Sequence, residues 1–252
     1  MKPAVSTSRL DRIDLLRAIA MLWMTVFHFC FDLNHFGFIA QDFYDDPFWT
    51  WQRSCIVSLF LFTAGLSQAV ALQQGQGWPR FWTRWAQVAG GALLVSAGSW
   101  LMFPDTFIYF GILHGIAAML ILVRLTAGWG AWLWALGALA ISMKWVAPLV
   151  IGVLPSLAFL NQPGWNALGF ISELPVTEDY APVLPWLGVM WWGVAAGHWA
   201  LANRPQWLGA GDAPATGPRR ALVVLGRWSL SYYLLHQPVL IALLSAVVWW
   251  RG

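Results

Sequence analysis

The sequence contains little charge for its length. Asp, Glu, Lys and Arg make up 10% of the 252 residues, whereas soluble domains contain about 25%. Hydrophobic residues make up 59% of the chain, and the mean hydropathy is +0.61. These values exclude an ordinary soluble domain. We therefore expect an all-α, polytopic membrane protein, with residues 1–252 forming a single integral-membrane domain whose partner is the lipid bilayer.

Motifs for several kinds of chemistry are also missing. The chain has no His-x-x-x-His or Cys-x-x-Cys spacing, so we expect no metal. It has no Gly-x-Ser-x-Gly, so a serine nucleophile is not indicated. Lys and Arg do not cluster outside the membrane flanks, and we expect no nucleic acid partner. The two cysteines, Cys30 and Cys55, could form a disulfide. The simpler interpretation is that both are buried thiols.

Apolar runs of membrane-spanning length are the main feature that is present. The segment 148–160 is ambiguous because it is short and contains Pro148 and Pro155, so eight spans are an alternative to seven. We expect about seven transmembrane helices, at residues 13–36, 50–72, 81–103, 107–125, 130–154, 183–203 and 222–249.

The distribution of positive charge favours seven spans with a cytoplasmic N-terminus. Basic residues collect on the cytoplasmic side of membrane proteins. An eighth span would move to the outer side four arginines that seven spans place in the cytoplasm. We expect a cytoplasmic tail at 1–12, an outer loop at 155–182 and an inner linker at 204–221, of which 204–218 is flexible by composition. Of the 14 Lys and Arg, the seven-span arrangement leaves only Arg53, Lys144 and Arg251 outside.

Ionisable residues follow one face of the first predicted span. A charged group at mid-bilayer costs about 2.5–3.5 kcal/mol on the most lenient scale, so such residues usually have a function. Arg17 and His28 are about 16 Å apart along a helix that rises about 1.5 Å per residue. We interpret this face as the wall of a reaction channel. At three- or four-residue spacing it contains Asp14, Arg17, Met21, Thr25, His28, Asp32 and His35.

Within this face, His28 is the candidate general base. Asp32 lies one helical turn further on, where it could accept a hydrogen bond from one ring nitrogen and leave the other to take a proton from a substrate. Imidazole is the side chain suited to that role near neutral pH. Arg17 would hold a donor substrate or pair with Asp14. His35 is the rival catalytic residue.

Two further histidines lie in predicted spans. His114 and His236, the latter beside Gln237, either bond neighbouring helices together or line the channel as substrate-binding groups. An inner fringe of arginines either sets topology and binds lipid headgroups or seats the phosphates of a cytoplasmic donor. This fringe comprises Arg80, Arg84, Arg219, Arg220 and Arg227.

Five blocks of sequence resemble one known family in the same order. The resemblance is to the bacterial branch of the heparan-α-glucosaminide N-acetyltransferase family, and the spacing from Arg17 to His28 also resembles membrane acyltransferases that O-acetylate cell-envelope sugars. The blocks are 12–20 (RIDLLRAIA), 60–67 (FLFTAGLS), 110–117 (FGILHGIA), 184–188 (LPWLG) and 235–238 (LHQP).

This resemblance implies a helical membrane acyltransferase. It would move an acetyl or other acyl group from acetyl-CoA (acyl-CoA) on the cytoplasmic side to a sugar amine or hydroxyl on a glycan acceptor, across the membrane. In the lysosomal branch the active histidine lies further along the chain, and His35 is its nearest counterpart here. Direct transfer and an acyl-histidine relay are both open, as is a homodimer.

Two other functional classes compete with the transferase. A small proton-coupled transporter or permeation module would use the polar face as a path, and a non-catalytic membrane partner would need no chemistry there. The short connections and the lack of room for a soluble luminal domain favour a bacterial cytoplasmic (inner) membrane.

Overall fold

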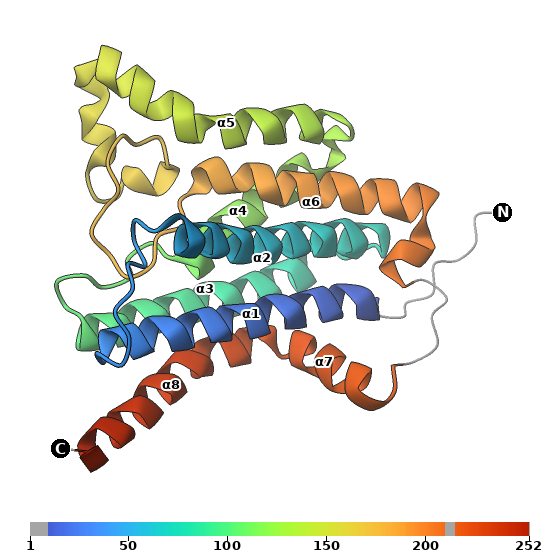
Figure 1. The fold of residues 1–252 in the computed structure, drawn as a ribbon. Helices are drawn as coiled ribbons and strands as arrows, with labels where there is room; N and C mark the ends of the chain where they lie inside the picture. The colour runs from blue at the N-terminus through green and yellow to red at the C-terminus, as the bar shows by residue number, and fades with distance from the viewer. Residues whose placement is uncertain (1–9, 210–214, 252) are drawn as a thin grey trace. The chain divides into compact units, whose positions relative to one another are not determined.

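The computed structural model describes residues 10–209 and 215–251, and over these ranges the chain is helical with no β-strand (Figure 1). The predicted all-α class is therefore confirmed. The long helices are α1 (Asp11–His35), α2 (Pro47–Gln73), α3 (Trp78–Met102), α4 (Ile112–Thr126), α5 (Trp132–Val153), α6 (Val183–Asn203), α7 (Gly217–Arg227) and α8 (Ser229–Arg251). Short 3-10 turns are η1 (Ala127–Trp129), η2 (Pro155–Asn161), η3 (Asn166–Leu168) and η4 (Pro205–Leu208).

Five helical segments in the described ranges are long and apolar enough to cross a membrane: α1, α2, α4 extended through η1, α5 and α8. The chain is thus a helical membrane protein with five candidate spans. The predicted run 222–249 is two helices, because α7 ends at Arg227 and α8 begins at Ser229. The ambiguous 148–160 is the end of α5, which continues through Pro148, followed by η2.

Local signals explain where the first helices begin and end. Asp11 and Asp14 lie in the first turn of α1, where a negative charge complements the helix dipole. The helix ends at His35, and Gly37 follows its C-cap with a left-handed φ of 75°, while the Phe38 N–H donates to the Leu33 carbonyl as in a Schellman motif. Pro47 then opens α2 behind an Asp46 carboxylate that accepts the Phe48 N–H at 2.7 Å.

Contacts divide the chain into two compact units, each described here by itself. The central unit comprises residues 61–205, and the terminal unit comprises residues 9–60 and 206–252. Helix α2 contributes to both, so its first part belongs to the terminal unit and the rest to the central one. The predicted single domain over 1–252 remains a prediction.

In the central unit, small residues let helices approach closely. Helix α6 packs along α5 (Figure 1), and a Cβ on Gly193 would collide with the Phe62 carbonyl of α2. Such small-residue contacts are typical of membrane helices. The segment before α4 pairs with the predicted outer loop: Phe110 bridges Tyr180, and the Ala181 N–H donates to the Phe110 carbonyl.

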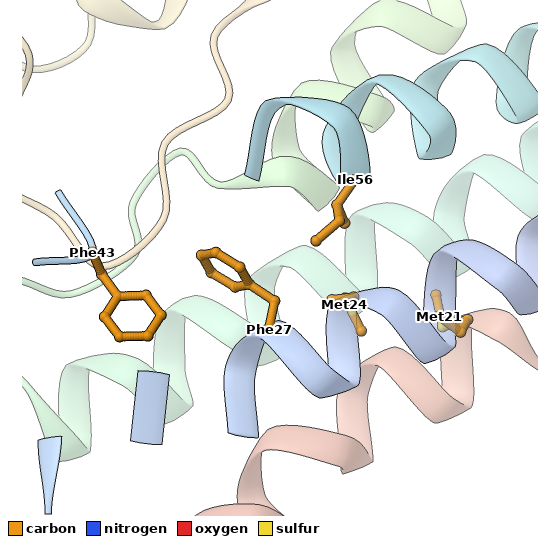
Figure 2. Close-up of a cluster of buried hydrophobic side chains, with 5 residues drawn as sticks. All are labelled: Met21, Met24, Phe27, Phe43 and Ile56. Atoms are coloured by element: carbon orange, nitrogen blue, oxygen red, sulfur yellow. The ribbon is translucent and has the colours of Figure 1, made fainter. Parts of the chain in front are cut away.

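In the terminal unit, α1 packs against α7 and α8. A buried apolar cluster joins Met21, Met24 and Phe27 of α1 to Phe43 and to Ile56 of α2 (Figure 2). Between membrane helices such side chains stabilise the fold mainly by close van der Waals packing, because lipid is as apolar as they are. Met21, which the spacing places on the polar face, is part of an apolar cluster that also contacts Tyr232 and Tyr233 of α8.

Two predicted connections differ from the structure in part. In the tail 1–12, residues 1–9 lie outside the described ranges, and α1 already begins at Asp11. In the linker 204–221, residues 210–214 lie outside them. The remainder of that linker includes η4 and the first turn of α7. Much of the linker predicted to be flexible is therefore helical.

Candidate active site

Residues of the polar face of α1 contact α7 near the start of the helix and α8 further along it. At its N-terminal end Arg17 Nη1 donates to Asp14 Oδ1 at 2.7 Å, and Arg227 Nε lies 3.5 Å from Asp14 Oδ2. Arg227 also donates to Asp11 at 2.9 Å. Of the two roles predicted for Arg17, the structure shows the pairing with Asp14. Arg227, expected in the basic fringe, is held by two carboxylates.

A glycine fixes the distance between α1 and α7 at this point. Gly226 packs directly on the Asp14 backbone, where any Cβ would collide with the Asp14 carbonyl. This contact brings the next residue, Arg227, within reach of the buried Asp14 carboxylate.

Further along the face, α1 contacts aromatic and imidazole side chains of α8. Thr25 Oγ1 lies 2.8 Å from the Tyr232 hydroxyl, and His28 Nδ1 lies 2.8 Å from His236 Nε2. His236 is buried, and its Nδ1 is 2.6 Å from the Tyr233 carbonyl. Two histidines that are 208 positions apart in the chain are therefore hydrogen-bonded to each other.

Asp32 binds Gln237 and not His28. Gln237 Nε2 donates to Asp32 Oδ1 at 2.7 Å, so the predicted hydrogen bond between Asp32 and His28 is replaced. The physical reason is that both side chains point to α8, where His236 and Gln237 are adjacent. Asp32 Oδ2 and Gln237 Oε1 are buried and have no hydrogen-bond partner within the described ranges. His35, at the exposed end of α1, interacts electrostatically with Asp32.

The contacts between α1 and α8 follow the same residue order along both helices. Thr25, His28 and Asp32 of α1 meet Tyr232, His236 and Gln237 of α8. Helices α1 and α8 therefore run parallel, as Figure 1 shows.

His114 belongs to the central unit and caps α4. The Gly111 N–H donates to its Nδ1 at 3.3 Å, and its Nε2 lies 3.1 Å from Ser96 Oγ. Because Ser96 gives its own proton to the Ile108 carbonyl at 2.6 Å, His114 Nε2 is the donor. Both ring nitrogens are engaged in local structure, and the predicted substrate-binding role of His114 remains a prediction.

The predicted outer loop contains a polar cluster that the sequence did not suggest. Asn166 is 1% exposed and donates to the Tyr109 hydroxyl at 2.7 Å, while the Tyr180 hydroxyl donates to the Asn166 carbonyl at 2.6 Å. Burial, and then the neighbouring Tyr109, raises the pKa of the Tyr180 phenol above its ordinary value. Nothing in the local sequence of Asn166 distinguishes it from other loop residues, because its partners are distant in the chain.

Arg124 and the cysteines have structural settings. The Arg124 guanidinium donates to the Gln76 carbonyl and lies over the rings of Trp78 and Phe81, at 5.3 Å and 5.5 Å. Cys30 and Cys55 are both free thiols, as the simpler interpretation predicts, but they are half-buried and not fully buried. Among the described residues no three His, Cys, Asp or Glu side chains gather as metal ligands.

A family model described as heparan-alpha-glucosaminide N-acetyltransferase, catalytic, matches residues 9–238. The chain belongs to this family. The matched range includes the whole polar face of α1 and its partners up to Gln237 on α8. This N-acetyltransferase family and the five apolar segments make the chain a membrane acetyltransferase integral to the bilayer. No curated protein and no solved structure matches it.

Proposed function

We propose that this protein transfers an acetyl or other acyl group from acyl-CoA to an amine or hydroxyl of a sugar acceptor, with His28 as the general base. Family membership supports acetyl transfer. The observation that carries the residue assignment is the pairing of His28 with His236 on the polar face of α1. Ionisable side chains within membrane-spanning helices are energetically costly, so a histidine pair there usually has a function.

The proton and the acyl group move in one balanced sequence. His28 takes the N–H or O–H proton of the acceptor while the acceptor nitrogen or oxygen attacks the thioester carbonyl. The carbon–sulfur bond then breaks, and the CoA thiolate takes the proton from the His28 imidazolium, which restores the neutral base. General-base help of this kind contributes about 10²–10⁴-fold.

Asp32 and Gln237 fit the recognition of the acceptor. Each has one buried oxygen that finds no donor among the described residues, and such an oxygen costs about 1–3 kcal/mol. N–H or O–H groups of a sugar would satisfy both atoms. We assign Asp32 and Gln237 to binding the acceptor one helical turn from His28.

The membrane arrangement that we propose has seven spans, a cytoplasmic N-terminus and an outer C-terminus, in a bacterial inner membrane. Its support is the positive charge that seven spans place inside. The parallel course of α1 and α8 adds to this, since two parallel spans require an odd number of crossings between them, and seven spans place five between the first and the last.

The assignment of His28 is tested by transfer of labelled acetyl from acetyl-CoA by the purified protein in detergent. The acceptors are glucosamine, glucose and N-acetylglucosamine, which separate amine from hydroxyl acceptance. We expect His28→Ala to lose about 10²–10⁴-fold in kcat, and His198→Ala, on α6, to serve as the matched control. Loss in His35→Ala with an active His28→Ala would transfer the role to His35. Full activity in both variants would refute a histidine base on α1.

Donor binding is tested separately by thermal unfolding. A ligand that binds the native state raises apparent stability by RT ln(1 + [L]/Kd). We expect saturable stabilisation by acetyl-CoA and CoA, weaker with dephospho-CoA because it lacks a phosphate. An unchanged melting temperature at millimolar acetyl-CoA, in a folded protein, would contradict the donor assignment.

A further inference from the structure

The hydrogen bonds around His236 determine which ring nitrogens carry protons. The Tyr233 carbonyl can only accept, so His236 Nδ1, at 2.6 Å, carries the proton of that bond. His236 is 8% exposed, and within the described part of the chain its side chain contacts His28, Tyr232 and Tyr233 and no carboxylate. A buried imidazole in such surroundings is neutral, because a charge there would be uncompensated.

The same reasoning extends to His28. A neutral His236 with its proton on Nδ1 has a lone pair on Nε2, which can only accept. His28 Nδ1, 2.8 Å away, must therefore be the donor. In neutral His28 the proton is then on Nδ1, and Nε2 has the free lone pair.

The ring geometry agrees with this direction. The His28 and His236 rings are 21° from parallel with centroids 5.0 Å apart. With facing nitrogens 2.8 Å apart, the two rings approach edge to edge, as an in-plane N–H···N bond requires. The Tyr232 ring is nearly parallel to His236, at 6° and 6.1 Å.

We propose that His236 is a positioning residue that holds His28 in the Nδ1–H tautomer, so that Nε2 is the atom that accepts the substrate proton. This inference rests on the proposed function for its kinetic consequence but not for the tautomer itself. The Tyr233 carbonyl fixes the proton of His236 on Nδ1. The bare Nε2 of His236 then fixes the proton of His28 on Nδ1. In water the Nε2–H form of imidazole is the commoner one, so His28 released from His236 would mostly present the wrong nitrogen.

The tautomer is measured directly by ¹⁵N NMR of the full-length protein labelled at histidine. Proton-bearing and bare ring nitrogens have well-separated shifts, and the His28 signals are those lost in His28→Asn. We expect a protonated Nδ1 and a bare Nε2 at neutral pH. A protonated His28 Nε2 in the wild-type protein would overturn the proposal without any mutation in the pair.

Two variants of His236 separate positioning from packing. Gln can accept from His28 through its oxygen and donate to the Tyr233 carbonyl through its amide, whereas Leu can do neither. We expect His236→Leu to shift His28 towards the Nε2–H form and to lower kcat by about 10–100-fold, as loss of an orienting partner does, with KM for acyl-CoA unchanged. His236→Gln should restore both readouts, and His198→Leu is the control.

The outcomes distinguish this inference from the proposed function. If His236→Leu keeps the Nδ1–H tautomer and full kcat, or if His236→Gln fails to restore either readout, the positioning role is wrong. If His28→Ala is fully active while the tautomer responds to His236 as expected, the general-base assignment fails and the positioning of His28 stands.

Discussion

Asp14 holds two arginines where α1 meets α7, and its neutralisation should weaken the terminal unit. The carboxylate is 2% exposed, and its partners Arg17 and Arg227 are 20% and 39% exposed. Asp14→Asn keeps the shape of the side chain and removes its charge. Asp11→Asn is a matched control, because Asp11 is 17% exposed and shares the partner Arg227 at 2.9 Å.

The expected magnitude follows from burial. Removing one partner of a buried ion pair costs about 3–5 kcal/mol. Here both guanidinium groups reach solvent in part and Arg227 retains Asp11, so we expect about 2 kcal/mol for Asp14→Asn. The exposed pair of the control contributes about 0–1 kcal/mol. At about 2–4 °C per kcal/mol, Asp14→Asn should lower the melting temperature by about 4–8 °C.

The assay is thermal unfolding of the purified variants in the same detergent, with and without 0.5 M salt. Salt screens exposed charges more than buried ones, so the effect of Asp11→Asn should shrink and that of Asp14→Asn should persist. Equal losses in the two variants, or a neutral Asp14→Asn, would refute the argument that burial makes the Asp14 cluster important.

Two further predictions concern packing and alkaline stability. Gly226→Ala should lower stability by about 1–3 kcal/mol, because its Cβ would collide with the Asp14 carbonyl. Gly90→Ala, in open space on α3, should raise stability by about 0.5–1 kcal/mol. Thermal unfolding measures both effects. Because the pKa of Tyr180 is raised in the folded state, its contribution is present below pH about 10 and is lost at higher pH. The melting temperature of Tyr180→Phe should therefore fall less than that of the wild type between pH 9 and 11.

The fold could be predicted wherever hydrophobicity alone decides it. The run 13–36 corresponds to α1 and the run 183–203 coincides with α6, because long apolar runs of this kind form helices. Hydropathy does not report backbone geometry, however. The run 222–249 continues across Trp228, yet the chain breaks there, and the apolar residues 107–111 precede α4 and pair with the outer loop.

The site could be predicted up to the face of one helix. Periodicity places Arg17, His28 and Asp32 together on α1, and that is what the structure has. Periodicity cannot identify a partner on another helix, and it pairs His28 with Asp32 because this acid lies one turn away on the same helical face. The true partner of His28, His236, was recognised only as a histidine within a predicted span.

The parallel course of α1 and α8 leads to a final prediction about the two ends of the chain. If both helices cross the bilayer in the same direction, the number of spans is odd and the termini lie on opposite sides, as in the seven-span arrangement. Alkaline phosphatase, active only outside the cytoplasm, should therefore be active when fused after residue 252, and green fluorescent protein fused there should be dark. Fusion after residue 203, at the end of α6, should give the reverse pattern. With the N-terminus in the cytoplasm, a fluorescent fusion after residue 252 would mean an even number of spans, which is incompatible with parallel α1 and α8 that both cross the membrane.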